Sequence, residues 1–405
     1  MTLLVQKYGG SSVADADKIK QVAHHLAQAH KEGNQVVAVV SAMGDTTDEL
    51  IALARQVSRH PPEREMDMLL STGEIVACTL VAMALRDQGL EAISLSGAQA
   101  GIRTDAGHSR ARILGVDTQR IHQELEQGRV VIVAGFQGVT EDMDITTLGR
   151  GGSDTTAVAL AIALKAQRCE VYTDVEGVYT ADPRIEPRAR RLDEVSYEEM
   201  LEMASYGARV MHNRAVELGW VYEMPILVAS TFRSGPGTLI HGGANMEVRN
   251  KVRGIAHEVD VAKVTLRGVP DRPGIAATLF QTLSQAGISV DTIVQNASVE
   301  RLTDLTFTVS RDHLEKALEM TKKVAKQIGA GDCLGDATLG KVSIVGAGMQ
   351  TAPGYAARMF QALYQEGINI ELITTSEIRI TCLIDEKRVP DAVRVLHKAF
   401  ELEQA

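Results

Sequence analysis

The sequence predicts an α/β protein whose first domain is a mainly parallel sheet with helices on both faces. Two observations support this fold class: strand-like and helix-like segments alternate over the first 240 residues, and the strand-like runs are continuously apolar. Alternation implies crossover connections and parallel strands, and continuous apolarity is expected of strands buried on both faces. A third observation, an internal repeat in the last third of the chain, predicts a second part built from two similar modules.

The elements of the first part follow one another in regular order. Strand-like runs occupy residues 3–9, 35–43, 92–97, 130–139, 169–179 and 226–231. Helical patterns occupy residues 18–30, 74–89, 117–128, 154–167 and 197–211. We assign residues 1–245 to this domain and interpret the stretch 246–262 as a connector, because the sequence around its start is rich in glycine and polar residues.

The repeat relates residues 273–293 to residues 353–373 at an offset of 80, with eleven of 21 positions identical. Each copy has the order strand, helix, strand, strand, helix, which is typical of a ferredoxin-like βαββαβ module. We place the modules at 263–340 and 341–405. The second copy has no room for a fourth strand, and an unpaired sheet edge is a liability, so we expect residues 252–260 to supply that strand.

Composition limits the functional classes. The chain has 42 basic and 52 acidic residues, a net charge of −10, which disfavours general nucleic-acid binding. We find no apolar run of the roughly 18–20 residues that a membrane span needs and no basic leader, and therefore expect a cytoplasmic protein. The four cysteines lie far apart, which favours reduced thiols over disulfides or a zinc site. We predict no metal ligand set among the side chains.

The first candidate segment is KYGGSS at residues 7–12. It follows a strand, at the edge where open α/β sheets bind ligands. Its glycines would let the backbone approach an anion, the helix after it would offer free N–H groups, and Lys7 would add a positive charge. The alternative is a glycine turn with a surface lysine.

The second candidate, VVSAMGDTTDEL at residues 39–50, repeats the same layout. Ser41 and Thr47 would place hydroxyl groups at the sheet edge, although ordinary helix capping by residues 45–47 is favoured when this stretch is taken alone. In LLSTGEIVA, Glu74 enters an apolar helix that residues 71–73 would cap. A buried carboxylate is costly unless paired, so a ligand ammonium is a suitable partner for it.

The most informative segment is TTLGRGGSDTT, residues 146–156. Arg150 stands between glycines beside a helix N-terminus, which suits bidentate capture of a carboxylate or phosphate. Asp154 is either part of this site or a helix cap. The stretch YTDVEGVYTADPR at residues 172–184 has the turn residues of a loop, for which solvent exposure and a nucleotide contact are equally favoured.

Taken together, KYGGSSV, VVSAMGDTTD, LLSTGE, TTLGRGGSD and VYTDVEGVYTADPR resemble the aspartate kinases of the amino-acid kinase family, over essentially the whole chain. The repeated modules resemble ACT modules, which are small amino-acid-binding regulatory units. The resemblance implies ATP- and Mg²⁺-dependent phosphorylation of the L-aspartate side chain to 4-phospho-L-aspartate, the first step toward lysine, threonine and methionine. Two alternatives are a kinase for acetylglutamate, glutamate or UMP, and a non-catalytic amino-acid sensor.

The resemblance also implies roles for individual residues. Catalytic roles fall to Lys7, Ser41, Asp154 and Arg209. Aspartate contacts fall to Thr47, Glu74, Arg150, Gly151, Gly152 and Ser153, with Glu74 on the ammonium and Arg150 on a carboxylate. ATP contacts fall to Lys7, Tyr8, Gly9, Gly10, Thr173, Asp174, Tyr179, Asp182 and Arg184. Arg209 departs from the family pattern, in which lysine is usual at this position.

For the ACT modules the resemblance implies lysine, threonine or both as allosteric effectors, bound between the two copies. The implied effector residues are Asp271, Pro273, Gly274, Ile275, Ala276, Ala277, Asp291, Gln295, Asn296, Met349, Ala352, Pro353, Gly354, Tyr355, Asn369, Ile370, Glu371 and Thr375. It further implies a homo-oligomer formed through ACT pairing, or an α₂β₂ assembly if an internal start at Met246 is used. No nucleic-acid or membrane partner is expected.

Overall fold

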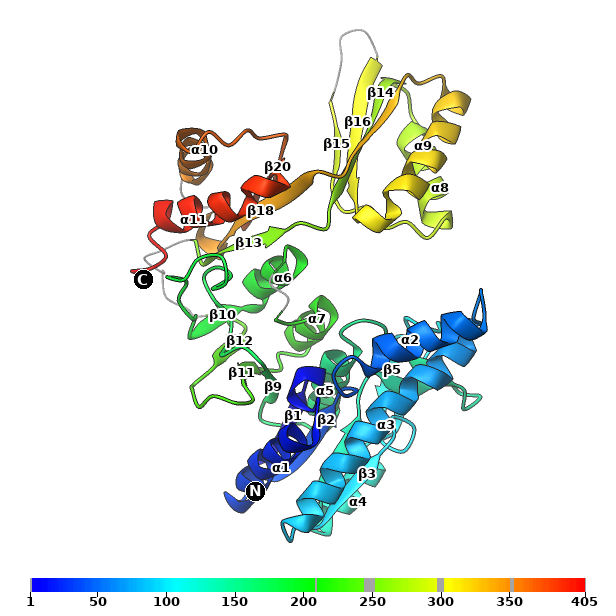
Figure 1. Ribbon diagram of the computed structural model, residues 1–405, viewed down its shortest axis with the longest axis vertical. Helices are drawn as coiled ribbons and strands as arrows, with labels where there is room; N and C mark the ends of the chain where they lie inside the picture. The colour runs from blue at the N-terminus through cyan, green and yellow to red at the C-terminus, as the bar shows by residue number, and fades with distance from the viewer. Residues whose placement is uncertain (1, 208–209, 244–251, 297–301, 350–352, 405) are drawn as a thin grey trace. The chain divides into compact units, whose positions relative to one another are not determined.

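The computed structural model describes residues 2–207, 210–243, 252–296, 302–349 and 353–404. Arg209 and Ala352, both predicted site residues, lie outside these ranges. Contacts divide the chain into two compact units, Met1–Tyr179 with Arg191–Met246, and Thr180–Arg190 with Glu247–Ala405 (Figure 1). The segment 180–190, which we assigned to the first domain from the sequence, thus makes its contacts within the second unit, where Ala181 joins the core.

The first unit is built on an eight-stranded sheet with the order β10-β12-β11-β9-β1-β2-β6-β3. Its strands are β1 (Leu3–Tyr8), β2 (Gln35–Val40), β3 (Ala92–Leu95), β6 (Val130–Ala134), β9 (Cys169–Thr173), β10 (Glu194–Ser196), β11 (Ile226–Ser230) and β12 (Thr238–His241). All neighbours pair in parallel except β11 with β12. The predicted mainly parallel sheet is confirmed.

Helices cover both faces of this sheet. Tyr8 packs in one core cluster with α1 (Ala16–Lys31) and α3 (Glu63–Asp87). Lys7, one residue earlier, reaches Asp154 of α5 (Gly152–Ala163). Because successive side chains of a strand point to opposite faces, α5 lies on the face opposite α1 and α3. The remaining helices of the unit are α2 (Thr46–Val57), α4 (Gln119–Glu126), α6 (Tyr197–Ser205) and α7 (Asn213–Val221).

A small second sheet, ordered β5-β4-β7-β8, accompanies the large one. It consists of β4 (Ile102–Thr104), β5 (Ile113–Val116), β7 (Gln137–Val139) and β8 (Ile145–Thr147). Our expectation of a single strand over residues 130–139 was therefore wrong. The chain leaves the large sheet after β6 and turns at Phe136, whose φ of +68° interrupts the extended run, before entering β7.

The starts of two helices bear on the expectation, and one of them differs from it. The helix that contains Glu74 begins eleven residues earlier, at Glu63, so residues 71–73 lie inside α3 instead of capping it. The last three residues of KYGGSS, Gly10–Ser12, form a 3-10 turn, and α1 starts at Ala16, close to the predicted helix of residues 18–30. Its N-cap Asp15 accepts a hydrogen bond from the Lys18 N–H. The Asp15 side chain therefore caps the N-terminus of α1.

Contrary to the expectation from the sequence, α3 is long and apolar enough to cross a membrane by the criteria of length and composition. Half of its apolar window is nevertheless buried within the unit. Its residues Ala77, Val81 and Leu85 pack against the strands of the large sheet. In this structure α3 is a core helix.

The second unit contains two modules of similar topology. The first has the sheet β15-β16-β14-β17, formed by β14 (Ala262–Pro270), β15 (Ile293–Gln295), β16 (Leu302–Val309) and β17 (Cys333–Asp336), with helices α8 (Ile275–Gln285) and α9 (Leu314–Ile328). The second has the sheet β13-β18-β20-β19, formed by β13 (Gly254–Glu258), β18 (Leu339–Val345), β19 (Leu372–Thr375) and β20 (Arg379–Asp385), with helices α10 (Tyr355–Gln365) and α11 (Val389–Ala399). Strand β13 pairs antiparallel with β18, which is the pairing we expected for residues 252–260.

Candidate active site

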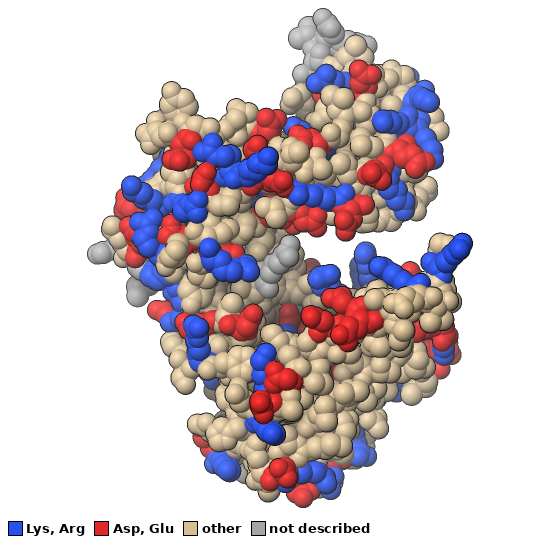
Figure 2. Space-filling view, viewed as in Figure 1, with Lys and Arg blue, Asp and Glu red and all other residues tan. Residues whose placement is uncertain are grey.

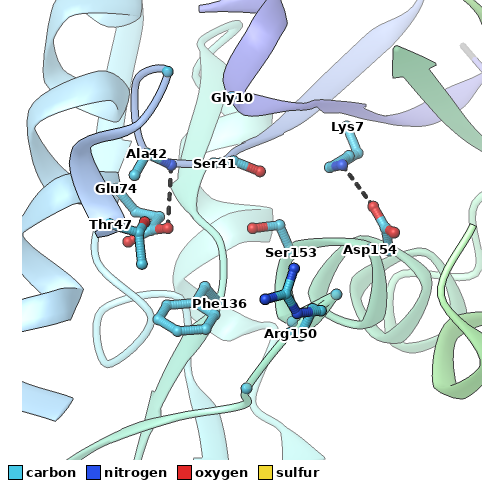
Figure 3. A pocket seen from close by; sticks show the side chains of 14 residues that line it. Lys7, Gly10, Ser41, Ala42, Thr47, Glu74, Phe136, Arg150, Ser153 and Asp154 are labelled. Carbon is cyan, nitrogen blue, oxygen red and sulfur yellow. Dashed lines mark hydrogen bonds and ion pairs between the residues drawn. The ribbon is translucent and has the colours of Figure 1, made fainter. Parts of the chain in front are cut away.

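A pocket of about 260 Å³ opens in the first unit, where β1 and β2 end and where α2 and α5 begin. Its lining residues are Lys7, Gly10, Ser41, Ala42, Gly44, Thr47, Glu74, Phe136, Gly149, Arg150, Gly151, Gly152, Ser153 and Asp154 (Figure 3). The structure thus brings together every residue predicted for catalysis or aspartate contact, apart from Arg209, which is outside the described ranges.

At one end of the pocket, the Lys7 ammonium lies 2.6 Å from a carboxylate oxygen of Asp154. Both side chains are nearly buried, with 12% and 11% of their surface exposed. The aspartate therefore fixes the direction of the lysine, and the lysine keeps a positive charge at the carboxyl end of β1. Asp154 does not cap α5: the N-cap of that helix is Gly151, and Asp154 lies in its first turn.

At the other end of the pocket in the view of Figure 3 lies Glu74. It is 3% exposed, and one carboxylate oxygen accepts a hydrogen bond of 3.1 Å from the Ala42 N–H. The second oxygen is buried and has no hydrogen-bond partner among the described residues. Burial raises the pKa of Glu74 to about 7. A cationic group placed beside this oxygen would restore the ionised form.

Between these ends lie Ser41, Ser153 and Arg150 (Figure 3). No side chain caps the N-terminus of α5 or of α2. The first amide of each helix is bonded to a backbone carbonyl, Gly152 to Gly149 and Thr46 to Met43, so an anion would be bound by the amides that follow these. The capping alternative for residues 45–47 is thereby weakened, since the N-cap residue Asp45 makes no side-chain hydrogen bond to α2. Arg150 is exposed and forms no salt bridge with any residue of the described ranges.

Two glycines are required by contacts. A Cβ at Gly10 would lie 2.8 Å from the Ala42 carbonyl oxygen, which would separate the ends of β1 and β2. Gly151 has a φ of +73°, and a Cβ there would lie 2.1 Å from the His212 ring. The loop that carries Arg150 can therefore follow its path only with glycine at this position.

The predicted nucleotide residues do not converge on the pocket as a group. Lys7 and Gly10 line it, whereas the Tyr8 side chain is fully buried on the other face, stacked on Tyr172. Thr173 and Asp174 hydrogen-bond to each other at the end of β9, and the Tyr179 hydroxyl donates to Glu176.

Asp182 and Arg184 belong to the second unit, and the Arg184 guanidinium lies 2.7 Å from the Asp182 carboxylate. Hydrogen bonding to Arg184 lowers the pKa of Asp182. These two side chains therefore satisfy one another in the structure.

Phe136, Ala42 and Gly44 line the pocket without having been predicted. Ala42 and Gly44 contribute their backbones to the pocket. Because the backbone is the same for every residue type, the sequence gives no indication of this contribution. Phe136 offered one signal, an aromatic residue after a glycine at the end of an apolar strand run. The apolar pattern of residues 130–139 predicts one continuous strand, and it gives no indication of the turn at Phe136.

The predicted effector residues gather around the equivalent helix starts of the two modules. Gly274 and Gly354 are the N-caps of α8 and α10, with φ of +95° and +109°. Asp291 and Glu371 occupy equivalent positions of the repeat, 80 residues apart. The other described members of the set flank these helices or lie on or beside β15 and β19.

Each of these two acidic residues is paired with a lysine from the other module. Lys341 of β18 pairs with Asp291, and Lys263 of β14 lies 3.1 Å from Glu371. The two lysines lie near the start of equivalent strands, in the sequences KVTL and KVSI. The repeat thus produces two reciprocal ion pairs inside one chain. Lys341 is the more buried lysine, at 4% exposure, and also pairs with Glu258.

Comparison with known families divides the chain in a similar way, except that the first match includes residues 180–190, which belong to the second unit. Residues 2–230 match the model of the amino acid kinase family. Residues 264–326 and 342–400 each match a model of the ACT domain.

Among known relatives, the aspartokinase of Pseudomonas aeruginosa is 51% identical over 405 residues, covering 100% of this chain and 98% of that protein. The crystal structure of E. coli aspartokinase III in complex with aspartate and ADP matches with a TM-score of 0.81 at 26% identity, covering 98% of this chain and 99% of the other. The complex of the same enzyme with lysine and aspartate matches with a TM-score of 0.76 at 26% identity, with the same coverage.

Proposed function

The chain belongs to the aspartate kinase family, and on this premise we propose that the 260 Å³ pocket is where ATP phosphorylates the side-chain carboxylate of L-aspartate. The observation that supports this most directly is the polarity of the pocket. A buried carboxylate with a free oxygen, Glu74, stands at one end, and a cation, Lys7, at the other. Aspartate carries the matching groups, an ammonium near one end and a reactive carboxylate at the other.

Glu74 would accept the ammonium of aspartate, and Arg150 would pair with its α-carboxylate in a bidentate manner. Thr47 and Ser153 offer hydroxyl groups along the same pocket. With its amino-acid end held, the substrate would direct its side-chain carboxylate toward Lys7. Such positioning converts the encounter of two anions into an oriented reaction within one complex.

The nucleophile is a carboxylate already ionised at neutral pH, so the reaction needs no strong general base. The protein must instead hold two anions in line and stabilise the charge of the transferring phosphoryl group. Lys7, oriented by Asp154, supplies a fixed positive charge, and the uncapped N-terminus of α5 supplies oriented amides. Ser41 lies between them in a position to hydrogen-bond to the reacting groups.

ATP as the phosphoryl donor is supported by the ADP complex of E. coli aspartokinase III. Magnesium fits a site of this kind, because it retains waters and binds mainly through nucleotide phosphates. Among the described residues no group of three or more metal-ligating side chains is present. When bound, the magnesium ion would neutralise phosphate charge. Thr173, Asp174 and Tyr179 remain our proposed nucleotide contacts.

The substrate is tested by measuring hydroxamate formation with aspartate, glutamate and acetylglutamate side by side. We expect turnover with aspartate alone. Absence of turnover with aspartate would refute the assignment and favour another amino-acid kinase. The Lys7→Ala variant should lose activity while still binding effector, and near-normal turnover in that variant would contradict the role of Lys7.

For regulation we propose that the ACT modules bind lysine, threonine or both and thereby inhibit the kinase. The lysine complex of E. coli aspartokinase III supports lysine as one effector. Activity titrations with lysine and threonine, separately and together, decide between them. Inhibition only by the mixture would assign a concerted mechanism, and no inhibition by either would refute the proposal.

A further inference from the structure

A second hollow of about 800 Å³ adjoins the active-site pocket within the first unit and shares Gly149 and Arg150 with it. Its walls come from four elements: the loop that leads into β5, the end of β8, and helices α5 and α7. The residues that line it are Arg110, Arg112, Ile113, Leu148, Gly149, Arg150, Thr155, His212, Arg214, Glu217, Leu218 and Val221. None of the roles assigned above uses this space.

The lining is strongly basic. Four arginines surround the hollow and one carboxylate, Glu217, faces them. Arg110, Arg112 and Arg150 form no salt bridge with any described residue. On the face shown in Figure 2, in contrast, basic and acidic side chains are interspersed. The chain has a net charge of −10, so a cavity lined by arginines without salt bridges to described residues is a local region of positive electrostatic potential.

The fourth arginine, Arg214, is fixed in place. Its guanidinium donates hydrogen bonds to the carbonyl oxygens of Leu148 at 2.6 Å and Ala111 at 3.0 Å. It thereby ties α7 to both loops that carry the other arginines. Burial and the neighbouring charge of Arg112 lower the pKa of Arg214. Arg112 and Arg214 are thus close enough to repel one another, and the nearby Asp105 carboxylate, which attracts both, offsets part of that repulsion.

We propose that this hollow is a subsite for a small dianion, occupied by a dicarboxylate, from which Arg110 and Arg112 deliver aspartate to Arg150. The proposal rests on the proposed role of Arg150 and extends it to the approach of the substrate. The lining contains no tryptophan, tyrosine or phenylalanine on which a nucleobase could stack, which favours a small anion over a nucleotide. Arg150, on the boundary, is accessible from both spaces.

The test uses succinate, a dicarboxylate without the ammonium that Glu74 would bind, titrated calorimetrically into the full-length protein without nucleotide. One ion pair at about 4 Å in water corresponds to roughly a fivefold change in affinity. We therefore expect the double variant R110Q/R112Q to bind succinate about 25-fold more weakly. The matched control is R59Q, which removes an exposed positive charge of the same unit that does not line the hollow, and should change affinity less than twofold.

The kinetic readout is kcat/KM for aspartate, which should fall in R110Q/R112Q mainly through KM, and by less as ionic strength rises. Unchanged succinate binding in the double variant would overturn the subsite, as would an equal loss in R59Q. Inorganic phosphate, titrated in parallel, tests the ligand: if it binds more tightly than succinate and depends on the same arginines, the dicarboxylate assignment is overturned. The proposed kinase activity is tested separately, by the turnover of aspartate in the wild-type protein.

Discussion

Substitution of Glu74 by glutamine tests the electrostatics of the aspartate pocket. Burial raises the pKa of this carboxyl from 4.5 to about 7. Below pH 4.5 both the folded and the unfolded chain carry it protonated, and it contributes nothing. Between pH 4.5 and about 7 the Glu74 carboxyl ionises in the unfolded chain and remains protonated in the folded chain. Glu74 therefore destabilises the folded state by up to about 3.4 kcal/mol, at 1.36 kcal/mol per pH unit. Because Glu74 is 3% exposed, little solvent screening reduces this cost.

The variant removes the ionisation while keeping the shape of the side chain. Any constant cost of the new amide is the same at every pH, so the informative quantity is the change in the free-energy difference between wild type and Glu74→Gln from pH 5 to pH 8. We expect the variant to gain about 2.5 kcal/mol relative to wild type over this range. The measurement is denaturant unfolding followed by tryptophan fluorescence, because the single tryptophan, Trp220, lies in α7 of the first unit.

The control for this experiment is Glu126→Gln, an exposed carboxyl on α4 whose removal should give no such pH-dependent gain. A second readout is the KM for aspartate of the wild type, which should rise as pH falls below about 7, because the protonated carboxyl no longer attracts an ammonium. If Glu74→Gln and wild type lose stability in parallel from pH 5 to pH 8, the reasoning about the buried, half-satisfied carboxylate is refuted.

Three further substitutions test other parts of the molecule. Lys7→Met should lower kcat by at least about 10²-fold, and a smaller loss in steady-state assays would argue against a transition-state role. It should also lower thermal stability, because it leaves the nearly buried Asp154 carboxylate unpaired. Gly151→Ala should destabilise the first unit by about 1–3 kcal/mol and raise the KM for aspartate, because its Cβ would meet His212 in a backbone of φ +73°; unchanged unfolding would contradict this. Lys341→Met should destabilise the second unit by about 1–3 kcal/mol, since it leaves Asp291 unpaired, and calorimetry should show the first unit's transition unmoved.

The fold was largely predictable because its signals are local and repeated. Continuous apolar runs identified the central strands, and the repeat identified both modules and the need for a strand from residues 252–260. The predictions of the element boundaries failed where the conformation of the backbone determines the structure. Phe136 adopts a positive φ, which the conformational propensity of phenylalanine does not indicate, and the sequence therefore predicts a single strand in place of β6 and β7. The start of α3 at Glu63 was missed because its first turns are polar.

Most of the residues that line the pocket were predictable from the motifs, whereas their geometry was not. The motifs that contain Lys7, Glu74 and Arg150 lie up to about 140 residues apart, and the parallel sheet with its helices brings them to one edge. Which oxygen of Glu74 stays free depends on the position of the Ala42 N–H, which residue types do not encode. The 800 Å³ hollow could not be predicted from the sequence, because its arginines come from three separate segments of the chain.

The segment 180–190 shows how the two units are linked through the chain itself. Tyr179 and Arg191 bridge each other in the first unit, and the residues between them pack in the second. There the Thr180 hydroxyl hydrogen-bonds at 2.9 Å to His397, a fully buried residue of α11 in the second ACT module. The proposed nucleotide residue Tyr179 is therefore covalently continuous with a segment anchored to the regulatory module. A rearrangement of α11 would therefore act on the backbone next to Tyr179, our proposed nucleotide contact.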